Sequence, residues 1–259
     1  MPETFDESRG IDVFVHVPKT GGTSLRGAVI DHYGLENVWI YRQAPGGLYC
    51  ATDHPLSLSN EVELSDKELS DEAPVSLIEA KLDAQRQRAT SPEVAFNRAA
   101  AIIGHFSVDH YGELLSRHNA RVFTIVRDPL DRMVSHYHHV KEYRKRKVHP
   151  LLLGWQANSN PDLPFTTFAL SPSLQNFQTS YTGSDPSRYN LISTTEDLGT
   201  FMQKVGLIAA QNEAPRLRVT TTPPLDEDQL SDPGFKRAFR QFHAADYAFY
   251  DALAGSRHV

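Results

Sequence analysis

Residues 16–24 read His16-Val17-Pro18-Lys19-Thr20-Gly21-Gly22-Thr23-Ser24, and this stretch decides the fold of the chain. It follows an apolar run at 11–15. In the next segment Leu25, Ala28, Val29 and His32 recur at the spacing of one face of an amphipathic helix, and Gly34 is placed to end that helix. The pattern therefore predicts a strand, a glycine loop and a helix in succession.

A loop of this kind favours a bound phosphate or sulfate, because backbone N–H groups and the positive end of the helix converge on it. Gly21 and Gly22 let the backbone approach the anion without an intervening Cβ, and Lys19 adds a mobile cation. Further donors come from the hydroxyl groups of Thr20, Thr23 and Ser24. The nucleoside triphosphate loop G-x-x-x-x-G-K-[ST] has its lysine after the second glycine. Lys19 precedes both glycines, so we expect a different geometry and a different metal requirement.

Further apolar runs alternate with helical patterns along the chain. They predict strands at 37–41, 99–103, 122–126 and 190–193. Such alternation predicts an α/β fold with a central, mostly parallel sheet flanked by helices. Ligands bind such sheets beyond the carboxyl ends of the strands. Because Lys19, His105 and Arg127 each follow a predicted strand, we expect them at one edge of the sheet.

The second motif is Arg127-Asp128-Pro129-Leu130-Asp131-Arg132-Met133-Val134-Ser135. Asp128 suits the N-cap of the following helix and Pro129 its first position. An arginine at a strand end can hold a phosphate bidentately, and Ser135 follows two helical turns later. The alternative is that Arg127 pairs with a carboxylate such as Asp131 and that Ser135 is an ordinary surface hydroxyl.

Together, the two motifs resemble the cofactor signatures of sulfotransferases that use 3′-phosphoadenosine 5′-phosphosulfate (PAPS). Gly104-His105 resembles the catalytic-base position of the heparan sulfate 2-O-sulfotransferase-like branch, sulfotransferase family 2. Weaker similarity follows at 176–179, 195–198 and 246–250, whereas the acidic region at 53–93 matches nothing in the family pattern.

The resemblance implies a bacterial-type soluble enzyme with a three-layer P-loop-like fold. Residues 19–24 would hold the 5′-phosphosulfate, and Arg127 and Ser135 the 3′-phosphate. Lys19 would stabilise the leaving group and His105 would remove a proton from the acceptor hydroxyl, a task that suits histidine near neutral pH. His16 and His110 are alternative bases at the same edge.

Length and composition limit the organisation, location and partners of the protein. The 259 residues fit a single domain with an acidic helical insertion at 53–95. The net charge of −6 argues against a general nucleic-acid binder. The single cysteine, Cys50, favours a reducing compartment. With no signal peptide and no long apolar run, we expect a cytoplasmic protein without a membrane span. The acceptor, a small molecule or a carbohydrate, and the oligomeric state stay open.

Two clusters allow more than one interpretation. The histidines at 136–139 point different ways on a helix and lack acidic or cysteine partners at ligand spacing, so no metal is expected. The basic cluster at 141–147 fits either an anion site or a charged helix end that complements the helix dipole. Besides a sulfotransferase, the pattern allows a P-loop kinase, or a non-catalytic nucleotide- or glycan-binding module that retains only the fold.

Overall fold

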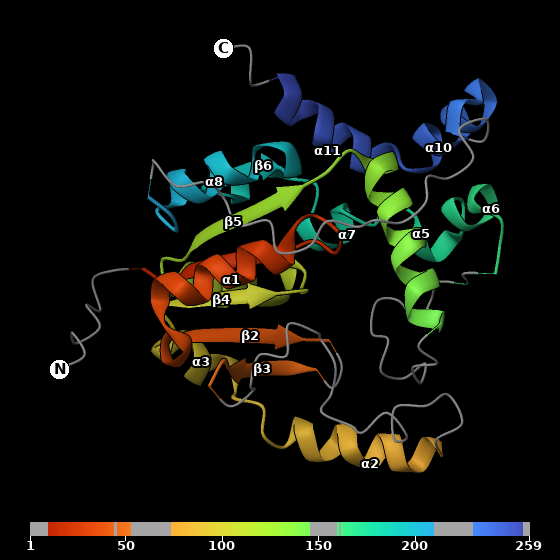
Figure 1. Cartoon of the computed structure of the whole chain (residues 1–259). Helices are drawn as coiled ribbons and strands as arrows, with labels where there is room; N and C mark the ends of the chain where they lie inside the picture. The colour runs from red at the N-terminus through yellow and green to blue at the C-terminus, as the bar shows by residue number, and fades with distance from the viewer. Residues whose placement is uncertain are drawn as a thin grey trace.

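The computed structural model describes residues 10–43, 46–52, 74–145, 160, 162–209 and 230–255. Its centre is a six-stranded sheet in the order β3-β2-β4-β1-β5-β6 (Figure 1). The strands are β1 Asp12–His16, β2 Val38–Arg42, β3 Gly47–Cys50, β4 Ala101–Gly104, β5 Arg121–Val126 and β6 Leu191–Thr194. All neighbours are parallel except β3, which is antiparallel to β2. The predicted mostly parallel sheet is confirmed.

Helices connect the strands and cover the sheet. They are α1 Gly22–Tyr33, α2 Val75–Arg86, α3 Pro92–Arg98, α4 Gly112–Arg117, α5 Pro129–Lys145, α6 Phe165–Ala169, α7 Thr179–Thr182, α8 Leu198–Val205, α10 Pro233–Phe242 and α11 Ala244–Gly255. Short 3₁₀ turns lie at Leu35–Asn37 (η1), Val108–Tyr111 (η2), Pro172–Leu174 (η5), Pro186–Arg188 (η6) and Thr195–Asp197 (η7).

Alternation along the strands gives each face of the sheet its own apolar core. Phe14 of β1 packs in one core with Leu25 of α1 and Phe201 of α8. Val13 and Val15, on either side of Phe14 in β1, lie in the other core, to which α3, α4, α5, α6, α10 and α11 contribute buried residues. Full burial of side chains of this size stabilises the fold by about 2 kcal/mol each. The three-layer arrangement thus follows from the period of the strands.

The predicted element boundaries are confirmed to within two residues. Gly34 ends α1 and donates its N–H to the carbonyl of Ile30 at 2.9 Å. The Asp128 carboxylate caps α5, because its Oδ1 accepts from the N–H groups of Leu130 at 2.9 Å and Asp131 at 3.0 Å. Gly34 thus marks the end of the helix that follows β1, and Asp128 marks the beginning of the helix that follows β5.

The predicted acidic insertion is covered in part, since 53–73 lie outside the described residues. Its remainder contains α2 and the beginning of α3. Ile78 and Leu82 of α2 are buried, and the Tyr49 hydroxyl of β3 donates to the Gln85 carbonyl at 3.2 Å. The described part of this region is largely helical and packs beside β3, while its being an insertion stays a prediction from the sequence. Among the described helices, none combines the length and apolar character that crossing a membrane requires.

Candidate active site

Three adjacent strands bring the predicted site residues to one edge of the sheet. β1 lies between β4 and β5 and is parallel to both, with Val15 opposite Gly104 and His16 opposite Ile125. The segments that leave the carboxyl ends of these strands carry Lys19, His105 and Arg127. The predicted shared edge is confirmed.

The glycine loop is built around two left-handed residues. Gly21 has φ 84°, and Lys19 has φ 74°, which costs a residue with a Cβ about 1–2 kcal/mol. The Thr20 hydroxyl is buried and donates to the Val17 carbonyl at 2.8 Å, so it stabilises the loop itself. Thr23 and Ser24 lie in the first turn of α1, the former half-buried and the latter buried.

The beginning of α1 has the features of an anion site. Among the described residues, no side chain caps the helix and its first turn holds no acidic residue. The first N–H groups of a helix have no intrahelical acceptor, and the helix dipole makes this end positive. An anion at Gly22 and Thr23 would satisfy both conditions.

His16 and His105 form a stacked pair directly behind the loop. Their ring centroids are 4.2 Å apart at an interplanar angle of 30°. Nδ1 of His105 lies 2.8 Å from the His16 carbonyl oxygen, which can only accept, so Nδ1 carries the proton. The neutral His105 ring then has its basic lone pair on Nε2. The His16 ring packs against Gly22, where a Cβ would lie 1.5 Å from its Nε2.

Burial and nearby cations keep both histidines neutral at pH 7. Burial lowers the pKa of His105 to about 4; its hydrogen bond to the His16 carbonyl opposes this, and Arg26 and Lys19 lower the pKa further. Burial also lowers the pKa of His16 well below its ordinary value, helped by His105, Arg26 and Lys19. Sequence reasoning missed Arg26. Its position four residues after Gly22, on the same helix face, is the signal that could have identified it.

Arg127 is half-buried, and within the described part of the chain it forms no ion pair. No carboxylate of a described residue lies within salt-bridge distance of it, and its Nε is buried without a hydrogen-bond partner. An Arg127–Asp131 pair is therefore not observed. The pKa of Asp131 is raised by burial and by Asp128, while Arg127 opposes the rise. A buried guanidinium nitrogen with no partner in the described part of the chain fits a site for an external anion.

Ser135 lies on α5 two turns beyond Arg127. It is half-buried, and its hydroxyl makes no hydrogen bond to any residue in the described ranges. It shares a helix face with Asp131 and Asp128, four and seven residues earlier, whereas Arg132 and His136 lie on the buried face. The sequence-predicted partner of Arg127 is thus on the helix that begins beside it.

The histidines of α5 do not form a metal centre within the described residues, where no cluster of three or more His, Cys, Asp or Glu side chains is found. His136 is fully buried, and its Nδ1 accepts from Arg132 at 3.3 Å. Burial, then Arg132, His139 and Lys19, lower the pKa of His136 well below its ordinary value. Lys19 therefore acts electrostatically on α5 as well as on His105.

His110 and Lys141, the first residue of the basic cluster at 141–147, lie at the surface of the protein. His110 is exposed on η2, with its ring edge-on to Tyr111 at 4.5 Å. Of the basic cluster, Lys141 is exposed and its Nζ lies 4.4 Å from the ring centroid of Tyr137. Residues 146 and 147 lie outside the described residues.

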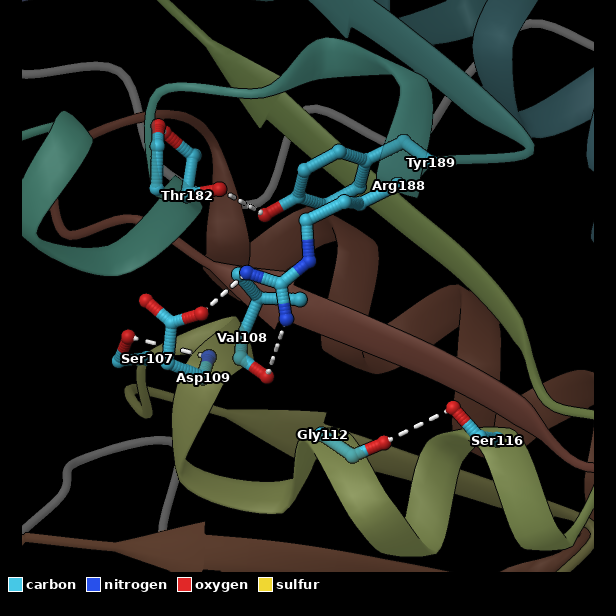
Figure 2. A network of polar contacts seen from close by, with 9 residues as sticks. Ser107, Val108, Asp109, Gly112, Ser116, Thr182, Arg188 and Tyr189 are labelled. Atoms are coloured by element: carbon cyan, nitrogen blue, oxygen red, sulfur yellow. Dashed lines mark hydrogen bonds and ion pairs between the residues drawn. The ribbon is translucent and has the colours of Figure 1, made fainter.

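The segment that follows His105 is anchored by contacts to η6. Figure 2 shows Arg188 of η6 paired with Asp109 and bonded to the Val108 carbonyl, with an Nη2 to oxygen distance of 3.4 Å. The neighbouring Tyr189 hydroxyl donates to the Thr182 carbonyl at 2.9 Å. These contacts tie η2 to η6 and α7, so the exit of β4 has a fixed course.

Comparison with known proteins identifies a family for this chain. The model of a family described as "Sulfotransferase domain" matches residues 12–181, a span that contains the loop, His105, Arg127 and Ser135. Among solved structures, a sulfotransferase from Alicyclobacillus acidocaldarius is similar over 95% of both chains, with 14% identity and a TM-score of 0.38. No curated protein matches the chain.

Proposed function

Since this chain belongs to the sulfotransferase domain family, we propose that it transfers a sulfuryl group from PAPS to a hydroxyl of a carbohydrate or small-metabolite acceptor. PAPS, when bound, supplies the sulfuryl group and leaves as adenosine 3′,5′-bisphosphate. The observation that carries the proposal is that Lys19, His105 and Arg127 each follow the carboxyl end of one of three adjacent parallel strands.

The glycine loop is the proposed site of the 5′-phosphosulfate. The uncapped helix end at Gly22 and Thr23, the left-handed Gly21 and the Lys19 ammonium together suit a doubly charged anion. Thr20 supports the loop from within through its bond to Val17, and Ser24 completes the first turn. Arg127 and Ser135 are the proposed site of the 3′-phosphate, supported by the buried, unpartnered Nε of Arg127.

His105 is the proposed general base. Its Nδ1–H is held by the His16 carbonyl, so Nε2 is the atom that accepts the proton of the acceptor hydroxyl. The acceptor oxygen forms the new S–O bond while the bond from sulfur to the 5′-phosphate oxygen breaks. Lys19 neutralises charge on that leaving oxygen, as expected for an in-line transfer governed by electrostatics. The proposed transfer uses these side chains and needs no metal ion.

The resemblance of Gly104-His105 to the catalytic-base position of the heparan sulfate 2-O-sulfotransferase-like branch supports a hydroxyl acceptor, either of a carbohydrate or of a small metabolite. The acceptor class, the single-domain organisation and the cytoplasmic location stay predictions from the sequence.

The deciding experiment follows transfer of labelled sulfate from PAPS to a panel of acceptors. We expect transfer by the wild type and its loss in Lys19→Ala and His105→Ala. Arg127→Ala should also weaken bisphosphate binding in calorimetry by about 100-fold, the order for a charged, bidentate contact. Unchanged bisphosphate affinity in Arg127→Ala would reject the 3′-phosphate site.

Ligand-induced thermal stabilisation separates a sulfotransferase from a kinase and from a binding module. Stabilisation by the bisphosphate without magnesium supports a sulfotransferase. Stabilisation by ATP and magnesium, with none by the bisphosphate, supports a kinase. A protein that binds the bisphosphate but transfers no sulfate to any acceptor would be a binding module.

A further inference from the structure

A single buried amide holds the backbone of Arg127 on both sides. Gln178, directly before α7, is 2% exposed. Its Oε1 accepts the Arg127 N–H at 3.0 Å, and its Nε2 donates to the Arg127 carbonyl at 2.8 Å. The last ladder pair of β5 is Val126 with Thr194, so Arg127 is the first residue beyond the pairing with β6. The Gln178 side chain thus takes the place of a neighbouring strand at this residue.

Gln178 is in turn held by Asp246 of α11. This carboxylate is 2% exposed and accepts the Gln178 N–H at 3.1 Å and the Thr179 N–H at 2.8 Å. The Thr179 hydroxyl donates to it at 2.9 Å. Asn176 completes the joint, because its Oδ1 accepts the Ala245 N–H at 3.1 Å. α11 and the segment before α7 are therefore locked together by buried polar contacts.

A buried carboxylate requires a nearby positive charge. Arg132 of α5 supplies it: the side chain is 1% exposed, and its guanidinium lies 4.3 Å from the ring centroid of Phe177. Burial lowers the pKa of Arg132 to about 10, while Asp246 acts in the opposite direction. Arg132 therefore stays charged at pH 7. Its positive charge compensates the buried carboxylate of Asp246 where α5, α7 and α11 meet.

The direction of the Arg127 side chain depends on this joint. Asp131 and Glu196 act on the Arg127 guanidinium electrostatically, but among the described residues neither forms an ion pair with it and its Nε has no hydrogen-bond partner. Its direction therefore depends strongly on its backbone. A displacement of about 1 Å is enough to weaken recognition of an anion substantially.

We propose that Gln178 is a positioning residue for Arg127 and that Asp246, by holding Gln178, makes α11 a determinant of 3′-phosphate affinity. This inference rests on the proposed function, since it takes Arg127 as the 3′-phosphate contact.

The test compares two nucleotides, adenosine 3′,5′-bisphosphate and adenosine 5′-monophosphate, by calorimetry on the full chain. The dissociation constant of the monophosphate divided by that of the bisphosphate measures what the 3′-phosphate contributes to binding. Gln178→Met keeps the length and packing of the side chain and removes both bonds to Arg127. We expect the ratio to fall about tenfold, with the monophosphate affinity within about twofold of wild type.

A matched control is Thr182→Val, a buried, nearly isosteric change one turn later. It removes hydroxyl bonds to the carbonyls of Gln178 and Gly183 and leaves both bonds to Arg127. Its nucleotide ratio should equal that of the wild type, even if its melting temperature falls. Should Gln178→Met fail to fold, Gln178→Glu serves instead, because it keeps the acceptor for the Arg127 N–H and loses the donor.

Three outcomes would overturn the inference. A wild-type ratio retained in the folded Gln178 variant, while Arg127→Ala abolishes it, removes the positioning role and leaves the proposed function intact. Equal weakening of both nucleotides indicates a general structural effect of Gln178. A wild type that binds both nucleotides equally overturns the 3′-phosphate site itself, and the inference with it.

Discussion

Gly22→Ala is the most informative single change at the loop. Gly22 is the first residue of α1, where a helical backbone accepts alanine without strain. Its Cβ, however, would lie 1.5 Å from both Cε1 and Nε2 of His16 and 2.4 Å from Cδ2. The imidazole must move by about 2 Å to reach ordinary contact, and it is stacked on His105.

The expected cost follows from opposing effects. Alanine gains up to about 1 kcal/mol over glycine within a helix, whereas overpacking a buried contact costs about 1–3 kcal/mol. We therefore expect a net destabilisation of about 1–2 kcal/mol, a fall in melting temperature of about 5 °C. Displacement of His105 should lower the rate of sulfate transfer by about 100-fold.

Gly112→Ala is the matched control, because Gly112 is likewise the first residue of a helix. Its Cβ would meet only Arg188 Nη2, at an ordinary 3.7 Å. This variant should be as stable as the wild type or slightly more stable. Adding His16→Ala to Gly22→Ala removes the clash, so the double variant should lose less stability than the sum of the losses of the two single variants. Wild-type melting and activity in Gly22→Ala would refute the reasoning.

Three further predictions concern pH, a helix cap and the second anion contact. Because burial lowers the pKa of His105 to about 4, kcat/KM should stay level from pH 7 to about 5 and fall only near 4; a decline centred at 6.5 would exclude this ring as the base. Because the folded state prefers the neutral His105 ring, this ring contributes fully to the free energy of unfolding at a pH above its unfolded pKa of about 6.5. This contribution is lost as pH falls from about 6.5 toward 4, by roughly 3 kcal/mol for this ring alone. Because His16 and His136 are also held neutral by burial, the measurement compares urea unfolding of the wild type and His105→Ala at pH 7 and at pH 4. Asp128→Ala removes the cap of α5 and should lower the free energy of unfolding by about 1 kcal/mol; no change in urea unfolding would contradict a stabilising cap. Ser135→Ala should weaken the bisphosphate about fivefold and leave the monophosphate unchanged, whereas equal effects on both would place Ser135 outside the 3′-phosphate site.

The loop, the parallel strands and their shared edge could be predicted because local patterns encode them. Runs such as 122–126 are apolar and β-branched, and the turn residues that follow them are distinctive. β3 escaped prediction because it is a four-residue edge strand that begins at Gly47 and lacks clear alternation. Its place is set by pairing with β2, for example Tyr49 opposite Ile40, and by packing against α3.

The surroundings of the site could not be predicted for a different reason. Gln178 bonds a residue 51 positions earlier, and Asp246 holds Gln178 across 68 positions, so no periodicity links them. Arginine side chains are usually exposed, so the sequence alone predicts an exposed Arg132. Its burial is possible because its guanidinium packs on the ring of Phe177 and interacts electrostatically with Asp246. Likewise, the His16–His105 stack exists only because β1 and β4 are neighbours.

The central place of β1 in the sheet bears on how the chain folds. Asp12 of β1 pairs with Ala101 of β4 on one side and with Arg121 of β5 on the other. Because β1 precedes both of them in the sequence, about a hundred further residues must be synthesised before both neighbouring strands are available. Until then an apolar segment exposes two unpaired edges, a condition that favours aggregation and slow refolding. Recombinant yield should therefore improve when synthesis is slowed by cooling, since β4 and β5 then have time to enclose β1 before chains meet.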